Sequence, residues 1–108
     1  MNEELLQCAL EKYPYVKLNK LVYRSLHTGK GSVGKMKTSI LSIGEIVEEI
    51  DKNTIVLSIK AGFANNNPAI IACYLEGNTL FCAAYAQEGL IKQHTAEKAL
   101  AKLEEVIK

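Results

Sequence analysis

The feature that most constrains the fold is a pair of apolar runs, 69–76 and 79–86, joined by Gly77-Asn78. Two β-rich runs separated by two turn-forming residues are typical of a β-hairpin. A two-residue turn pairs residue 76 with residue 79, and continuing this register places Cys73 opposite Cys82. The sequence therefore predicts an antiparallel sheet built around this hairpin.

Both faces of the hairpin are apolar in this register. One face carries Ile71, Cys73, Leu75, Leu80, Cys82 and Ala84, and the other carries Ile70, Ala72, Tyr74, Phe81, Ala83 and Tyr85. A solvated hairpin would alternate with polar residues, so something must cover each face. Helices can cover one face. The other face could be covered by another helix, by a ligand or by a second copy of the chain. Tyr74, Phe81 and Tyr85 are the residues that we expect in an interface between two copies.

Apolar spacing, caps and glycine or proline positions predict the remaining elements. We expect a helix over 2–12 with Leu5, Leu6, Ala9 and Leu10 on its inner face, strands over 15–26, 36–41 and 54–60, a loop over 63–68, and a helix over 96–107 with Thr95 as its N-cap. Pro14 ends the first helix, because the residue before a proline avoids helical geometry.

Residues 42–53 fit two structures. Ile43, Ile46, Val47 and Ile50 have the spacing of a helical stripe, and Ser42 with Glu45 forms a capping box. Gly44 and the β-branched residues lower helix propensity, which favours instead a hairpin turning at 51–54. The helix is preferred, and the hairpin stays as the alternative.

These elements predict a single α+β domain over 1–108, with a mainly antiparallel sheet of about five strands and helices at both ends. A short central helix near 43–52 completes the expected order of helix, two strands, helix, three strands, helix. That order is similar to profilin- and roadblock-like folds, although no motif places the chain in a family. Hydrophobic residues at 48% and charged residues at 23% exclude a disordered chain. The acidic start and the lack of a long apolar run predict a cytoplasmic protein without a membrane span.

Charge is distributed unevenly although the net charge is only +1. Residues 12–44 contain seven bases and no acid, whereas residues 45–108 contain nine acids and six bases. Such asymmetry is typical of a surface that meets an anionic partner. The residues that we expect to bind an anion are Lys17, Lys20, Arg24, Lys30, Lys35 and Lys37.

A near-match to a phosphate-binding loop lies within this basic region. Residues 29–36 read Gly-Lys-Gly-Ser-Val-Gly-Lys-Met, but a true phosphate loop has a hydroxyl where Met36 stands and opens into a helix. The residues after Lys35 look extended. A flexible connection is therefore preferred, with anion binding by its amides and lysines as the alternative.

Other chemistry is weakly indicated. Cys73 and Cys82 are close enough in the predicted register for a bridge, yet two reduced core thiols are the simpler interpretation. His94 stands alone before the last helix. We expect no catalytic residue, metal ligand or cofactor.

Three functions remain open. The leading hypothesis is a small non-enzymatic binding module whose basic segment 12–37 contacts nucleic acid or a phosphorylated ligand, most simply as a homo-oligomer. The second is a homodimeric interaction or scaffold subunit that uses the 69–86 hairpin. The third is a small enzyme that uses Cys73, Cys82 or His94.

Overall fold

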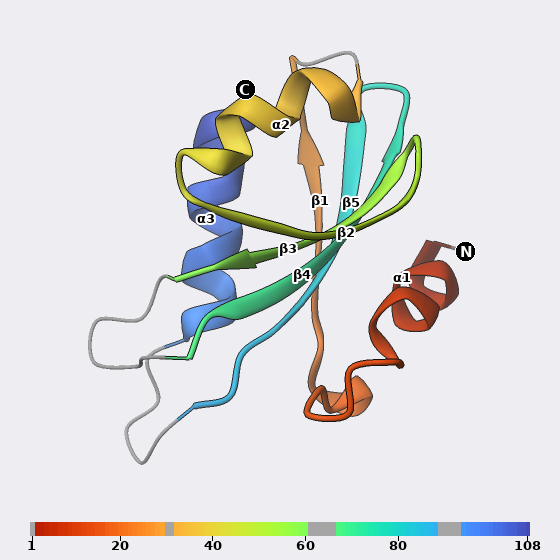
Figure 1. Cartoon of the computed structure of the whole chain (residues 1–108), viewed down its shortest axis with the longest axis vertical. Coiled ribbons are helices and arrows are strands. Elements are labelled where there is room, and N and C mark those ends of the chain that lie inside the picture. The colour runs from red at the N-terminus through yellow and green to blue at the C-terminus, as the bar shows by residue number, and fades with distance from the viewer. Residues whose placement is uncertain (1, 30–31, 61–66, 89–93) are drawn as a thin grey trace.

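The computed structural model describes residues 2–29, 32–60, 67–88 and 94–108, and its strands form one antiparallel sheet (Figure 1). In chain order the elements are α1 (Asn2–Leu10), a 3-10 helix η1 (Leu18–Lys20), β1 (Val22–His27), α2 (Val33–Leu41), β2 (Gly44–Asp51), β3 (Thr54–Ile59), β4 (Ala69–Glu76), β5 (Thr79–Tyr85) and α3 (Thr95–Ile107). The strand order β1-β5-β4-β3-β2 leaves β1 and β2 as the two edges. The predicted α+β class and five-stranded antiparallel sheet are confirmed.

The predicted hairpin is confirmed as the centre of the sheet. β4 and β5 pair in the expected register, with Cys73 opposite Cys82 and Tyr74 opposite Phe81. β3 pairs with β4 and β1 pairs with β5, so both hairpin strands are internal. Internal strands with apolar residues on both faces need cover from both sides.

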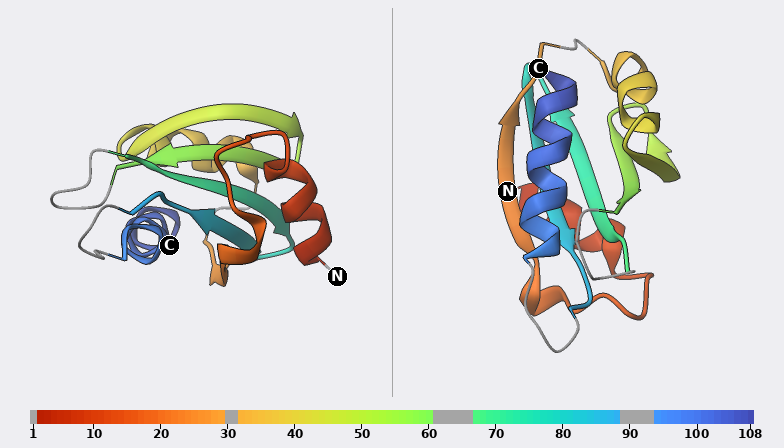
Figure 2. Two further views of the ribbon diagram at one scale, coloured as in Figure 1. Left: turned by 90° about the horizontal axis from the view of Figure 1, so that it is seen from below. Right: turned by 90° about the vertical axis from the view of Figure 1, so that its left-hand side faces the viewer.

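Helices of this chain cover both faces of the sheet (Figure 2). On one face α2 and α3 pack over a core that includes Met36, Leu100 and Leu103. On the other face α1 places Leu6 and Leu10 over the hairpin. The second apolar face is therefore covered by helix α1, which was one of the alternatives that the sequence allowed.

The segment between α1 and β1 differs from the predicted strand over 15–26. The strand begins only at Val22, and residues 18–20 form a single 3-10 turn in which the Lys20 amide donates to the Lys17 carbonyl at 2.9 Å. Val16 and Leu21, which suggested a longer strand, pack against the core under α1. The predicted first helix is confirmed over Asn2–Leu10, although Leu5 is 38% exposed.

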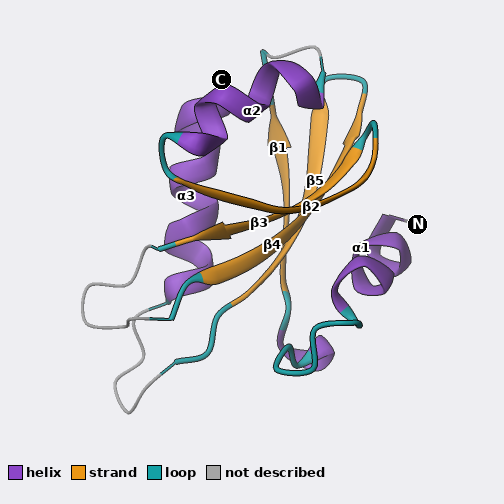
Figure 3. Ribbon diagram, viewed as in Figure 1, coloured by secondary structure: helices purple, strands orange, loops and turns teal. Residues whose placement is uncertain are grey.

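Residues 36–41, predicted as a strand, belong to helix α2 (Figure 3). The Ser32 side chain caps this helix by accepting a hydrogen bond from the Lys35 amide at 3.2 Å. Val33, Met36 and Ile40 are buried at helical spacing. This spacing and the serine cap were the overlooked signals, because the glycines on either side of Ser32 suggested a turn.

Residues 44–51, predicted as a helix, form edge strand β2, so the hairpin alternative was the right one. The register with β3 shifts between Ile46 and Glu48 and again between Glu49 and Asp51. Each shift is a β-bulge, which adds a residue and breaks the two-residue alternation. The bulges therefore give a strand the apolar spacing of a helix.

The observed order is helix, strand, helix, four strands, helix, which corrects the expected order. The last helix begins at Thr95, and His94 occupies the cap position without a side-chain cap. The expected Thr95 cap was therefore wrong by one residue. At the other end of α3, the Ile107 carbonyl accepts hydrogen bonds from the Thr28 hydroxyl at 2.6 Å and the Gly29 amide at 3.2 Å. This contact joins the end of β1 to the end of α3.

Candidate functional site

Two bases of the acid-free segment are used within the fold. Lys12 pairs with Glu48, and Lys37 pairs with Glu49. Both glutamates lie on β2, so these pairs join the turn after α1 and the body of α2 to the same edge strand. Lys37, which was predicted to bind an anion, therefore already faces a carboxylate.

Tyr13 reinforces the first of these contacts. Its hydroxyl donates to Glu48 at 2.9 Å, and its ring lies edge-on to that of Tyr15 with centroids 6.3 Å apart. Burial, followed by the hydrogen bond to Glu48, raises the pKa of Tyr13 to about 12. The hydrogen bond from Lys12, followed by that from Tyr13, lowers the pKa of Glu48. The Tyr13 ring thus has a structural role.

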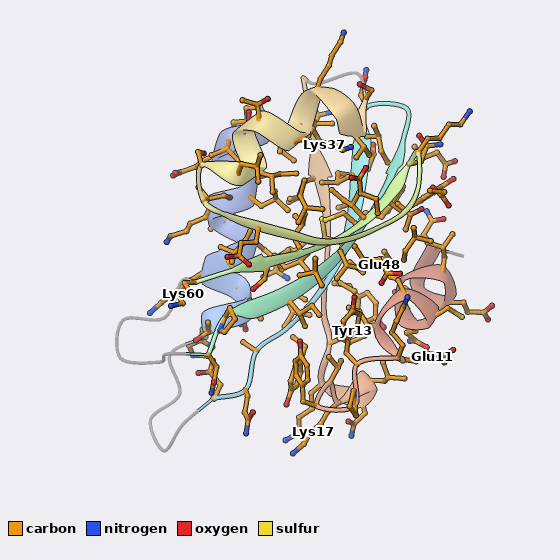
Figure 4. All side chains as sticks on the ribbon, viewed as in Figure 1. Glu11, Tyr13, Lys17, Lys37, Glu48 and Lys60 are labelled. Atoms are coloured by element: carbon orange, nitrogen blue, oxygen red, sulfur yellow. The ribbon has the colours of Figure 1, made fainter. Side chains whose placement is uncertain are left out.

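The remaining predicted bases do not gather in one patch. Lys17 is the N-cap of η1 and Lys20 is its last residue, shortly before β1 begins. Arg24 lies in the middle of β1, and Lys35 lies on the first turn of α2. Lys17 and Lys37 are at opposite ends of the molecule (Figure 4). Lys30 falls outside the described residues.

Lys17, Lys20, Arg24 and Lys35 are exposed, and we call them the β1 rim. Within the described ranges, no member of the rim forms an ion pair with another residue. The rim follows β1 from η1 to the start of α2. The structure therefore divides the described bases of the acid-free segment into a paired group, which stabilises the fold, and a group along one sheet edge that makes no ion pair with described residues.

β1 itself is a regular edge strand. Each of its residues pairs with β5, and the register has no shift. The Arg24 guanidinium donates to the Tyr23 carbonyl at 3.2 Å, so this carbonyl points away from β5. An edge without bulge or proline presents unpaired backbone groups in a straight row.

A hollow of about 240 Å³ adjoins this edge where α1 begins. It is lined by apolar and aromatic side chains and by polar and charged ones: Leu6, Tyr23, Phe81 and Cys82, and Asn2, Glu3, Arg24 and Ser25. The Gln7 amide donates to the Tyr23 hydroxyl at 2.8 Å, which holds this ring against α1. The hollow thus combines a partly apolar wall, two opposite charges and a strand edge.

The other end of the rim borders a hollow of mixed charge. Lys17 and Lys20 line it together with His94 and Glu97, whose Nδ1 and carboxylate lie 3.5 Å apart. The N-terminus of α3 lies nearby and already has a carboxylate partner, because the Thr95 amide donates to the Glu88 carboxylate at 2.8 Å. The carboxylates in this hollow make it a poor site for a small anion, so Lys17 and Lys20 are considered as part of the extended rim.

The residues predicted for an interface between copies lie under α1. Tyr85 is buried, and Tyr74 and Phe81 are half-buried against the same apolar cluster as Leu6. Larger apolar exposure occurs elsewhere, at Ile50, which is 42% exposed in β2. The hairpin faces are thus less accessible than the sequence suggested.

The candidate catalytic residues do not assemble into a site. Cys73 and Cys82 are buried with their sulfur atoms 3.7 Å apart, and burial raises the pKa of the Cys82 thiol. His94 is exposed beside Glu97. In the part of the chain that the structure describes, no group of three or more His, Cys, Asp or Glu residues could hold a metal ion.

The near-match to a phosphate loop does open into a helix, so the expected extended structure after Lys35 was wrong. Met36 is nevertheless fully buried in the core, which explains an apolar residue at the position that would need a hydroxyl. Lys30 and Gly31 lie outside the described residues.

Sequence reasoning missed the hollow beside β1. The alternation of residues 22–27 could have placed Tyr23 and Ser25 on one face of a strand. It could not show that this strand is an edge or that Phe81 lies next to it, because both depend on strand order. Leu6 was predicted as a core residue and also reaches this hollow.

No helix among residues 2–29, 32–60, 67–88 and 94–108 combines the length and the apolar character that crossing a membrane requires. No protein-family model, curated protein or solved structure matches the chain.

Proposed function

We infer that this protein is a small non-enzymatic binding module that contacts an anionic partner, such as nucleic acid or a phosphorylated ligand, through the β1 rim. The observation that carries the proposal is the division of the bases. Lys12 and Lys37 are paired with glutamates, whereas the four rim residues are exposed and make no ion pair with described residues.

The rim suits a long partner better than a small anion. Its members extend from η1 along β1 to α2 and do not converge on one point. Separate exposed bases each contribute about 0.5 kcal/mol to the binding free energy, and their effect is additive only along an extended anion. Lysine and arginine at intervals along one edge fit such a partner.

Heparin and a single-stranded oligonucleotide are suitable probes, studied over a series of salt concentrations. The double variant Lys17→Glu/Lys20→Glu should weaken binding about tenfold and reduce its salt dependence, because two cationic contacts become anionic. The matched control is Lys52→Glu/Lys60→Glu, which makes the same charge change at exposed lysines away from β1. Equal losses in both double variants would show a response to net charge and contradict a rim-specific contact.

A homodimeric interaction subunit is the second candidate. A hollow between α1 and β2 is lined by Leu5, Cys8 and Ile50, and the two larger side chains are more than one third exposed. Exposed apolar surface of this kind is common at protein interfaces. Sedimentation of the wild type beside Ile50→Asp tests it: a dimer that dissociates in the variant supports this candidate, and a monomeric wild type excludes it.

A further inference from the structure

The two edges of the sheet differ in how well they could accept another strand. β2 has two bulges and carries Glu45, Glu48, Glu49 and Asp51, features that disrupt strand pairing along an edge. β1 has an uninterrupted register with β5 and no acid. A regular edge strand is a template for further pairing unless something blocks it.

The outward backbone groups of β1 can be assigned from one hydrogen bond. The Thr28 amide donates to the carbonyl of Asn78, the residue directly opposite it in the β1–β5 register. In antiparallel pairs, hydrogen-bonded positions alternate with positions whose groups point the other way. Tyr23, Ser25 and His27 therefore direct their amides and carbonyls away from β5.

The Arg24 guanidinium supports this assignment. It donates to the Tyr23 carbonyl at 3.2 Å, as expected if that carbonyl faces outward. The contact is exposed and local, so an incoming amide could replace it at little cost. Arg24 would then be free to pair with a carboxylate of the incoming strand.

The hollow beside β1 determines which side chains an added strand would carry. Side chains of an added strand alternate between the two faces of the sheet. On the α1 face they would meet Leu6, Tyr23 and Phe81, which favour an apolar residue, and also Glu3, which disfavours an acid. On the opposite face, where alternation along β1 places Arg24 with Val22 and Leu26, they would lie near its guanidinium, which favours an acid and also borders the hollow.

We propose that β1 accepts an extended acidic segment of a partner polypeptide as a sixth strand of the sheet, with acidic residues toward Arg24 and an apolar residue in the hollow. This proposal rests on the proposed function and specifies its anionic partner. Backbone hydrogen bonds supply affinity in strand addition, and side-chain pockets supply specificity. Nucleic acid could use the rim bases but not the outward amides in this alternating pattern.

The test uses a peptide as long as β1 with alternating glutamate and valine residues, and the same peptide N-methylated at alternate positions. The unmodified peptide should bind, and the N-methylated peptide should bind at least about tenfold more weakly because it cannot complete the ladder. Arg24→Glu should weaken binding of the unmodified peptide about tenfold, whereas Lys52→Glu should leave it unchanged. In the complex, amide exchange should slow at Tyr23, Ser25 and His27.

Each outcome separates this proposal from the proposed function. Equal binding of both peptides, or no slowing of exchange on β1, would overturn strand addition even if the rim variants still lost affinity for heparin. Binding of the oligonucleotide but not of the peptide would also overturn it and would leave the proposed function standing. If heparin, the oligonucleotide and the peptide all fail to bind, both strand addition and the proposed function are overturned.

Discussion

The substitution Gly44→Ala tests whether residues 44–51 form a strand and not the helix that their apolar spacing suggests. Gly44 begins β2 and pairs with Ile59 of β3. A Cβ added there would lie 2.2 Å from the Ser58 carbonyl oxygen and 2.9 Å from Ile59 Cγ1. Because the nearest atom belongs to the backbone of a paired strand, β2 would have to move away from β3.

The expected cost follows from the size of this overlap. Overpacking typically lowers the free energy of unfolding by about 1–3 kcal/mol, and contact with rigid backbone places Gly44→Ala near the upper limit. For a domain of this size, this corresponds to a fall in Tm of roughly 10 °C. In a helix interior, the same substitution would raise the free energy of unfolding by about 1 kcal/mol. The two structures therefore predict opposite signs.

Gly34→Ala provides the matched control, because Gly34 lies in α2 and a Cβ there would be 3.8 Å from its nearest neighbour, the Ser32 hydroxyl. It should raise the free energy of unfolding by about 0.5–1 kcal/mol. Urea unfolding followed by circular dichroism measures both variants. A Gly44→Ala variant as stable as the wild type would refute the strand assignment.

Two further predictions concern side chains. Tyr13 should ionise only near pH 12 in a spectrophotometric titration, because its pKa is raised from 10.0 to about 12. Its folded pKa exceeds the unfolded one, so its contribution to stability is present below pH 10 and is lost as pH rises from about 10 to 12; Tyr13→Phe should remove this pH dependence. A thiol reagent should label Cys8 of the native protein rapidly and Cys73 and Cys82 only at the rate of unfolding. Rapid labelling of three thiols would show that the central strands open and would revive a catalytic role.

The central hairpin could be predicted from sequence because its information is local. Gly77 adopts a φ of +62° in the turn, a conformation that glycine enters without strain, and the flanking runs then fix the register. The helix over 95–107 could also be predicted from local sequence, because Leu100, Leu103 and Ile107 recur on one face.

The helix and strand over 33–51 were predicted in reverse because tertiary contacts override local pattern there. Val47 and Ile50 stand at the bulges of β2 and are exposed, so their helical spacing has no packing role. Met36 is buried in the core because it lies on helix α2. The nearby glycines favoured a turn there and so argued against a helix. Periodicity cannot reveal bulges, because a bulge depends on the partner strand.

Only part of the candidate site could be predicted from the sequence. The acid-free run identified the bases, but it did not show that Arg24 lies on an edge strand of the sheet. The run could not show that Lys12 and Lys37 pair with glutamates that follow it in sequence. Nor could it show that Phe81 and Leu6 lie beside β1, since these contacts require the sheet order and the position of α1.

Amide hydrogen exchange of the free protein tests most directly whether β1 is the open edge that strand addition requires. We predict alternation: the amides of Arg24 and Leu26 exchange slowly because they bond to β5, whereas those of Tyr23, Ser25 and His27 exchange at least about tenfold faster. Uniformly slow exchange along β1 would mean that the edge is already covered and would contradict the account.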